Sequence, residues 1–212
     1  MGGVGKSVEG SKSGTASEGI SAGIPEYGGS GKRYRGRDAF YQSKVCEGVF
    51  HRISSGTTRD GLEVFGKMEK GYLLSVDSNW DMYGDGYLSG HYFSEGALRE
   101  QLEKAYPGLV FTEEPVENQI NMYKRDKVGH ILFLTVGNKT ISGEEFRQLL
   151  ELPSSNFTMQ AADGKIRFLC KGQGHGLGLS QYGGNVLAKE GKSYKEILRY
   201  YFPECGVQKK DS

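Results

Sequence analysis

The residues best suited to chemistry lie in one glycine-rich stretch, Gly172–Gly184, which reads GQGHGLGLSQYGG. Glycine recurs at every second position in its first half, so the backbone can take positive φ angles and approach other groups closely. His175 stands among these glycines. Because an imidazole titrates near neutral pH, His175 could transfer a proton or hold a ligand hydroxyl. It could equally be a histidine that backbone hydrogen bonds satisfy, fixing a turn from strand to helix.

Three polar residues follow and add further candidate groups. Ser180 could be a nucleophile or the N-cap of a helix. The nucleophile elbow Gly-x-Ser-x-Gly requires a second glycine where this chain has Tyr182, which favours the cap. Gln181 and Tyr182 supply an amide and a phenol that could bind a sugar or its N-acetyl group. Alternatively, they cap the helix and pack in the core.

A second polar cluster surrounds Gly56 and consists of His51, Ser54, Ser55, Thr57 and Thr58. A third polar group follows it in the sequence. The first could be another wall of a ligand cleft or simple turn chemistry. In the other, Asp77 and Asp81 flank Trp80; a carboxylate beside an aromatic ring suits sugar chemistry, but acidic residues are also common in turns. We assign no catalytic residue, and predict as substrate-binding candidates His175, Ser180, Gln181, Tyr182, His51, Ser54, Ser55, Thr57 and Asp81.

Several ligand classes are disfavoured. The glycine stretch is not a dinucleotide-binding loop, because Leu177 occupies the place of its third glycine. Gly61–Lys67 nearly spells a phosphate-binding loop, but Met68 replaces the Ser or Thr that would reach magnesium. The chain has 27 basic and 26 acidic residues, so it offers no net field that would attract nucleic acid. We expect no cofactor, no metal and no nucleic-acid partner.

The cysteines and the apolar runs bear on location. Cys46, Cys170 and Cys205 are widely spaced without a Cys-x-x-Cys pair, so a zinc site is disfavoured. They are expected as buried or free thiols, or as one disulfide and an odd thiol if the protein is exported. We expect no membrane span, because no apolar run approaches about 20 residues. The start of the chain lacks the apolar core of a secretory signal.

Periodicity and capping signals predict the elements that must position these residues. Capping boxes begin helices at Ser142 and Ser193, while Ser94 and Ser180 are single N-caps. The expected helices cover residues 94–105, 142–152, 180–190 and 193–202. The expected strands are two short ones within 40–53, followed by 109–111, 119–123, 130–136 and 165–170. The order lacks regular βαβ alternation, which indicates an α+β fold with mainly antiparallel strands.

The two ends of the chain are expected to lie outside the folded domain. Residues 1–36 hold eleven glycines and few large apolar side chains, so they bury too little area to offset the entropy of ordering. We therefore predict a disordered tail over 1–37, a single domain over 38–205 and a short tail over 206–212.

The glycine stretch and four other segments resemble the SpoIID/LytB family. The C-terminal match runs from Gly174 through Tyr194-Lys-Glu-Ile-Leu-Arg-Tyr-Tyr-Phe-Pro203. Upstream, Phe50-His-Arg-Ile-Ser-Ser-Gly-Thr-Thr58 is similar to the family's Ser-Gly-Gly-Thr segment. Tyr72-Leu-Leu-Ser-Val-Asp-Ser-Asn-Trp-Asp81 is similar to its Tyr-Leu-x-Ser-Val-x-x-x-x-Asp segment. Arg147–Phe157 resembles its Arg-x-x-Leu-x-Leu-x-Ser-x-x-Phe run. The matches keep the family's order over residues 45–203, the C-terminal two-thirds of the family domain.

One family element has no counterpart. The family's helix with Glu-Ala-Leu-Lys-Ala-Gln-Ala, whose Glu is its proposed general acid/base, is not matched, and Glu9, Glu18 and Glu26 lie in unrelated surroundings. The family's Cys/His segment, which holds zinc in some members, is also unmatched. We therefore expect a truncated or incomplete chain that retains the glycan cleft, with weak or no activity.

The resemblance implies a function at the bacterial cell wall. It implies peptidoglycan glycan strands as ligand, lytic transglycosylation as chemistry and a location at the cell envelope. The alternative is a non-catalytic wall-binding module or amidase enhancer, with a wall amidase or other sporulation proteins as partners.

Overall fold

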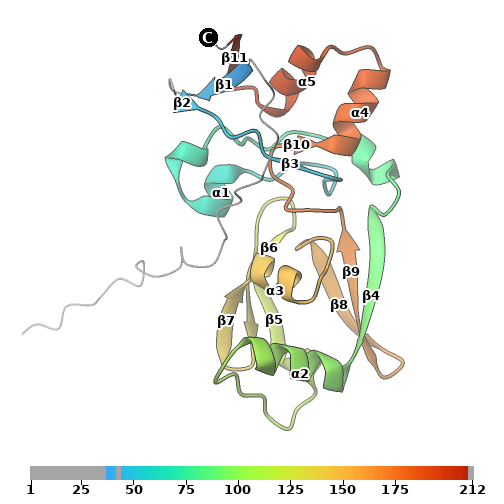
Figure 1. The fold of residues 1–212 in the computed structure, drawn as a ribbon. Helices are drawn as coiled ribbons and strands as arrows, with labels where there is room; N and C mark the ends of the chain where they lie inside the picture. The colour runs from blue at the N-terminus through green and yellow to red at the C-terminus, as the bar shows by residue number, and fades with distance from the viewer. Residues whose placement is uncertain (1–36, 42–43, 210–212) are drawn as a thin grey trace, which may run out of the picture.

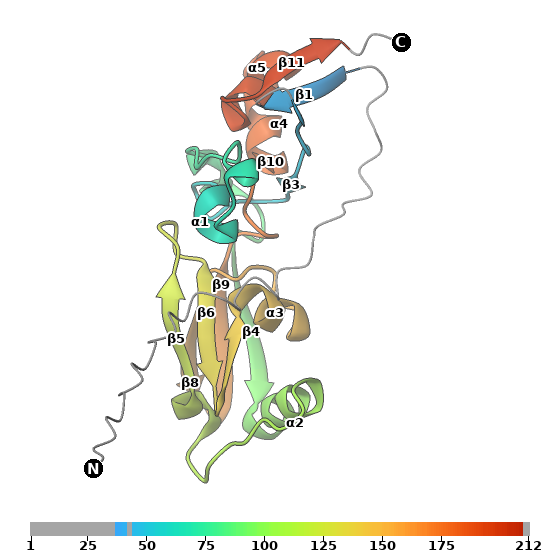
Figure 2. The ribbon, with the colours of Figure 1, turned by 90° about the vertical axis from the view of Figure 1, so that its left-hand side faces the viewer.

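The elements form two lobes in a computed structural model that describes residues 37–41 and 44–209. Residues 88–171 make one lobe, which we call the sheet lobe. The remaining described residues, 37–41, 44–87 and 172–209, make the terminal lobe. Figures 1 and 2 show the sheet lobe below and the terminal lobe above, joined by two adjacent chain crossings. The backbone N–H of Gly172 donates to the Tyr87 carbonyl at 2.7 Å, which ties these crossings together.

Two antiparallel sheets make up most of the sheet lobe. One has the order β4-β9-β8 and the other β5-β6-β7. Along β9, buried residues alternate with more exposed ones, because successive side chains of a strand point to opposite faces. The strands are β4 (Leu88–Ser94), β5 (Ile120–Arg125), β6 (Ile131–Val136), β7 (Lys139–Ser142), β8 (Phe157–Ala162) and β9 (Lys165–Lys171).

Two helices complete the core of this lobe, α2 (Glu95–Ala105) and α3 (Gly143–Leu149). Leu98 and Leu102 of α2 and Phe146 of α3 are fully buried. They join one apolar cluster with the inward residues of both sheets. Within this cluster the rings of Phe146, Phe157 and Phe168 lie 5.4–5.7 Å apart.

The terminal lobe has its own apolar core. It contains Leu73, Leu177, Tyr201 and Phe202 among its buried members. Its strands form a β11-β1-β2 antiparallel sheet and a short parallel pair between β10 and β3. These elements are β1 (Arg37–Tyr41), β2 (Lys44–Val45), β3 (Phe50–His51), β10 (Leu179–Ser180), β11 (Gly206–Lys209), α1 (Gly61–Phe65), α4 (Gln181–Lys189) and α5 (Tyr194–Tyr201).

The predicted helix starts are confirmed. The Ser94 and Ser180 side chains accept hydrogen bonds from Ala97 and Gly183 backbone N–H groups. Ser142 and Ser193 form complete capping boxes with glutamates three residues later. Short 3₁₀ helices occur at η1 (Met68–Lys70), η2 (Asn79–Tyr83) and η3 (Val116–Gln119). Within the described ranges, no helix has the length and apolar character that crossing a membrane would require.

The predicted α+β class with mainly antiparallel strands is confirmed, but some boundaries differ. Residues 109–111 are not a strand, because the Val110 N–H donates to the Asn138 side chain and not to a neighbouring strand. Residues 40–53 contribute to three short strands and not two. Strands β4, β7 and β8 were not predicted.

Strands occupy part of both expected tails. β1 begins at Arg37, and Gly206–Lys209 forms β11, which pairs antiparallel with β1 from Arg37 to Phe40. The ladder gives the backbone groups of 206–209 partners that a free tail would lack. The rest of the predicted N-terminal tail, residues 1–36, lies outside the described residues, as do 210–212.

Candidate functional site at the junction of the lobes

The glycine stretch crosses from the sheet lobe into the terminal lobe and needs its glycines. Gly172, Gly174, Gly176 and Gly178 all have positive φ angles, between 68° and 105°. A side chain at Gly178 would collide with the Val49 carbonyl, and one at Gly174 would lie 2.8 Å from the His51 Cβ. Alternating glycine therefore serves close backbone packing in a left-handed conformation.

This packing brings the glycine stretch against the polar cluster around Gly56. β10 pairs with β3, so that Ser180 lies opposite His51. Isolated bridges join Ile53 to Gln173 and Arg59 to Leu177. Two regions about 120 residues apart in sequence are thus in contact, as an arrangement of two cleft walls would require.

Asp81 joins two other predicted candidates, Ser54 and Ser180, in one buried group. Its Oδ2 accepts the Ser54 backbone N–H at 2.7 Å, and its Oδ1 accepts the Ser180 hydroxyl at 2.9 Å. Ser180 Oγ in turn accepts the Gly183 N–H as the N-cap of α4. Ser54, Asp81 and Ser180 are at most 1% exposed, so they hydrogen-bond with one another and not with solvent.

His51 and His175 lie together, with ring centroids 5.8 Å apart. His51 is buried, and its Nδ1–H donates to the Leu177 carbonyl at 3.0 Å, which leaves Nε2 without a partner among the described residues. Burial lowers the pKa of His51 to about 3, so the ring is neutral at physiological pH.

His175 is half-buried and accepts the Leu177 backbone N–H on Nδ1 at 3.1 Å. In the neutral ring the proton therefore belongs to Nε2, and the ring also hydrogen-bonds the Phe50 backbone. Burial lowers the pKa of His175, while the Glu144 carboxylate opposes that shift by raising it. The ring is thus held by backbone groups, with the Glu144 carboxylate close enough to act on its pKa.

Arg59 and Asp126 join the lobes on the other side of the glycine stretch. Arg59 Nε lies 2.6 Å from Asp126 Oδ2, and both side chains are nearly fully buried. Arg59 Nη1 donates to the His175 carbonyl at 3.1 Å. Asp126 Oδ1 accepts the backbone N–H of His130, whose buried Nδ1 contacts Ser155 Oγ. Burial lowers the pKa of His130 well below its ordinary value.

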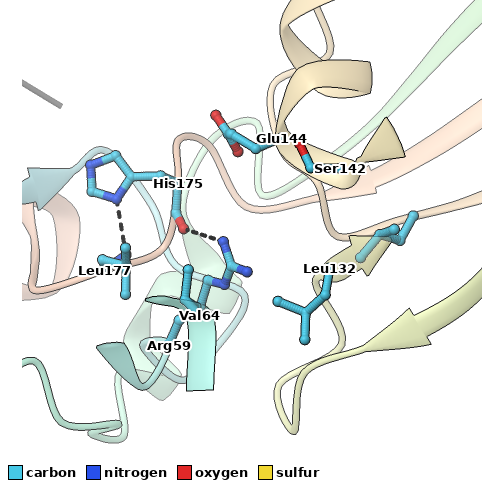
Figure 3. Close-up of a pocket in the computed structure, with 8 residues that line it drawn as sticks. Arg59, Val64, Leu132, Ser142, Glu144, His175 and Leu177 are labelled. Atoms are coloured by element: carbon cyan, nitrogen blue, oxygen red, sulfur yellow. Dashed lines mark hydrogen bonds between the residues drawn. The ribbon is translucent and has the colours of Figure 1, made fainter. Parts of the chain in front are cut away.

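A small pocket opens at this junction (Figure 3). Its volume of about 20 Å³ is enough for roughly one water molecule. Figure 3 shows Glu144 reaching from α3 toward the His175 segment, with the His175 ring on the opposite side of that segment from Arg59. The pocket combines an apolar wall with polar residues. The wall is formed by Val64, Ile131, Leu132 and Leu177, and the polar residues are Arg59, Ser142, Glu144 and His175.

Glu144 is held by Arg147 of the same helix. Arg147 Nε donates to Glu144 Oε1 at 2.8 Å, and Arg147 Nη1 donates to the Leu152 carbonyl. Charge-assisted bonds of this kind suit an ionised carboxylate. The pocket therefore offers a fixed hydrogen-bond acceptor at its rim.

The remaining candidates are spread around this junction. Gln181 is exposed at the start of α4, whereas Tyr182 is half-buried and packs against Gly84. Ser55 has a buried hydroxyl without a partner in the described part of the chain. Thr57 reaches the Asp77 carboxylate at 3.5 Å. The role of these residues, and of His175, in substrate binding stays a prediction.

Although three histidines converge, the described residues hold no group of three or more His, Cys, Asp or Glu side chains arranged to bind a metal ion. His51 and His130 each have a buried Nε2 that meets no hydrogen-bond partner in the described ranges. The Nε2 of His130 lies against Gly176, where a Cβ would be only 3.0 Å away. Glycine at 176 thus makes room for the imidazole.

Sequence reasoning missed Arg59, Asp126, His130 and Glu144. Glu144 had a usable signal: the capping box explains Glu145 but leaves the adjacent carboxylate unexplained. Arg59 and Asp126 are 67 residues apart and carry no local signal of their pairing. Only the folded chain brings them together.

Comparisons with known proteins find relatives over most of this chain. No protein-family model matches the chain. Stage II sporulation protein D of Bacillus amyloliquefaciens is 30% identical over 178 residues, which cover 84% of this chain and 49% of that protein. Its Bacillus subtilis counterpart is 27% identical over 179 residues, covering 84% and 50%. The amidase enhancer of Bacillus subtilis is 32% identical over 88 residues, covering 42% of this chain and 12% of that protein.

The chain thus spans about half the length of the sporulation proteins it matches. A match that spans 178 of the 212 residues must include residues 35–178, and so the polar cluster around Gly56 and the first half of the glycine stretch with His175. Over that region, the chain belongs to the SpoIID/LytB family.

Proposed function

We propose that this chain binds peptidoglycan glycan strands at the junction of its lobes and takes part in their processing at the cell envelope. The observation that carries the proposal is the pocket, which the Glu144 carboxylate and the Arg59 guanidinium line together with the His175 segment. A guanidinium donor and a carboxylate acceptor at one pocket match the hydroxyl and amide groups of amino sugars. Membership of the SpoIID/LytB family supports the same ligand class.

The pocket fits one group of such a sugar. At about 20 Å³ it is far too small for a whole ring, so the glycan lies across its mouth. Val64, Leu132 and Leu177 give it an apolar wall. The methyl of an N-acetyl group fits that wall, and the amide N–H can donate to Glu144. The site would thus select N-acetylated sugars.

The chemistry proposed for the strands is lytic transglycosylation. A carboxylic acid protonates the glycosidic oxygen, then takes the proton of the sugar 6-hydroxyl as that oxygen attacks the anomeric carbon. An acid with a raised pKa is suited to this step. Glu144, bonded to Arg147, is better suited to holding the sugar than to donating a proton. We therefore expect this chain alone to bind strands with little or no cleavage.

The test is to incubate the chain with glycan strands stripped of stem peptides. Co-sedimentation measures binding, and mass spectrometry detects anhydro-ended fragments. His175→Ala and Glu144→Gln should both reduce co-sedimentation, while His91→Ala, a half-buried histidine of β4 in the sheet lobe, should not. Undiminished binding by both site variants, with folding verified by circular dichroism, would exclude this site. Rapid release of anhydro sugars would contradict the expected weak chemistry.

A second candidate function is that of a non-catalytic wall-binding module or amidase enhancer. The observation that favours it is the 32% identity over 88 residues to a protein named amidase enhancer. The measurement that separates the two is the rate of a purified wall amidase on intact walls with and without this chain. A rate increase that His175→Ala leaves intact would favour this function over glycan binding at the junction.

A further inference from the structure

Two cysteines meet where the ends of the described chain come together. Cys46 Sγ and Cys205 Sγ are 3.0 Å apart although 159 residues separate them. Cys46 follows β2, and Cys205 precedes β11. These strands flank β1, where Phe40 pairs with Val45 on one side and with Gly206 on the other.

We propose that Cys46 and Cys205 form a disulfide that closes the terminal lobe. The bond requires the sulfur atoms to approach by only about 1 Å, since a disulfide is about 2 Å long. This inference does not depend on glycan binding. It concerns a covalent link between the chain segment that follows β2 and the one that precedes β11.

The third cysteine is in the wrong place for such a link. Cys170 lies in β9 and is fully buried in the core of the sheet lobe. Cys46 and Cys205 belong to the other apolar cluster, that of the terminal lobe. The fold therefore selects one pair from the three that the sequence left open.

The bond can form by thiol–disulfide exchange with a small or protein disulfide as oxidant. The Cys46 thiolate attacks one sulfur of the oxidant and releases the other as a thiol, giving a mixed disulfide. The Cys205 thiolate then attacks the Cys46 sulfur and releases the second thiol. Each protein thiol proton ends on a departing thiolate. The protein pair is oxidised and the oxidant is reduced to two thiols.

The surroundings set the order of attack. Cys46 is only half-buried, whereas Cys205 is 6% exposed. Burial raises the pKa of both thiols, that of Cys205 to about 12. Cys46 is therefore the first thiol to react, and Cys205 resolves the mixed disulfide. The same burial makes the reaction slow near neutral pH.

Peptide mapping tests the link directly. The full chain is incubated with oxidised glutathione, its remaining thiols are alkylated, and it is digested with trypsin without reduction. We expect a disulfide between the peptides VCEGVFHR (45–52) and YYFPECGVQK (200–209), and an alkylated Cys170 in FLCK (168–171). Alkylation of all three cysteines, or a link that contains Cys170, would overturn the proposal.

Thermal unfolding gives a second readout. Oxidation should raise the Tm of the wild-type chain by about 5 to 15 °C, because the bond closes a very long loop. Cys170→Ser should keep this increase, whereas Cys46→Ser and Cys205→Ala should each lose it. An equal increase in all four proteins would show that oxidation acts elsewhere and would contradict the proposal.

Discussion

Arg59 and Asp126 form an ion pair across the junction of the two lobes, with Nε and Oδ2 2.6 Å apart. The pair lies beside the glycine stretch, because Arg59 also donates to the His175 carbonyl, while Asp126 accepts the His130 N–H. Its two members come from different lobes, so the pair couples their positions.

Asp126→Asn should lower the free energy of unfolding by about 3 to 5 kcal/mol, because Arg59 would keep a buried charge without its partner. Urea unfolding measures the loss. Asp85→Asn, at an exposed position, should change the stability by less than about 0.5 kcal/mol. The double variant Arg59→Met/Asp126→Leu should lose less free energy of unfolding than Arg59→Met and Asp126→Leu lose in sum. Additive losses would argue against coupling.

Neighbouring glycines of α4 should respond oppositely to alanine. A Cβ at Gly183 would collide with Tyr201 Oη and Ser78 Oγ, whereas one at Gly184 would meet Ile197 at an ordinary 3.6 Å. We expect Gly183→Ala to destabilise by about 1 to 3 kcal/mol. Gly184→Ala should stabilise by up to about 1 kcal/mol through helix propensity. Thermal unfolding of the two variants side by side decides this, and equal shifts would contradict the packing of α4.

Stability should fall as the pH drops below about 6.5. The unfolded His51 takes up a proton near its ordinary pKa of 6.5, but the folded one does so only near 3. Between these values the unfolded state binds more protons, so the free energy of unfolding falls by at most about 1.4 kcal/mol per pH unit. His130 and His175, whose pKa values are also lowered, add to the loss.

Replacing His51 should flatten this pH dependence. The amide of His51→Asn can donate to the Leu177 carbonyl in place of Nδ1–H but does not titrate. Urea unfolding between pH 4 and 8 should then show a smaller slope than in the wild type. An unaltered slope in His51→Asn would mean that this ring does not contribute.

Filling the pocket should block glycan binding. Val64→Phe adds bulk to the half-buried wall contributed by α1. We expect the affinity for N-acetylated glycan strands to fall by about tenfold, or about 1.4 kcal/mol. Val110→Phe places the same ring at a site that is 59% exposed and should bind normally. Equal affinities measured by calorimetry would remove the pocket from the proposed site.

The local parts of the fold were readable from the sequence. Each capped helix begins at its predicted serine, because capping depends on residues within one turn. β4 escaped prediction because it has no fully buried residue, which leaves its apolar alternation weak. The close packing of the glycine stretch was foreseen, but the Arg59–Asp126 pair was not, since it depends on how distant segments meet.

The two crossings between the lobes lie side by side, since Leu88 pairs with Lys171 at the start of β4 and the end of β9. The sheet lobe is therefore a continuous insertion whose ends are already joined by a ladder. An insertion of this kind can become longer or shorter, or be exchanged between relatives, without a change in the fold of the terminal lobe.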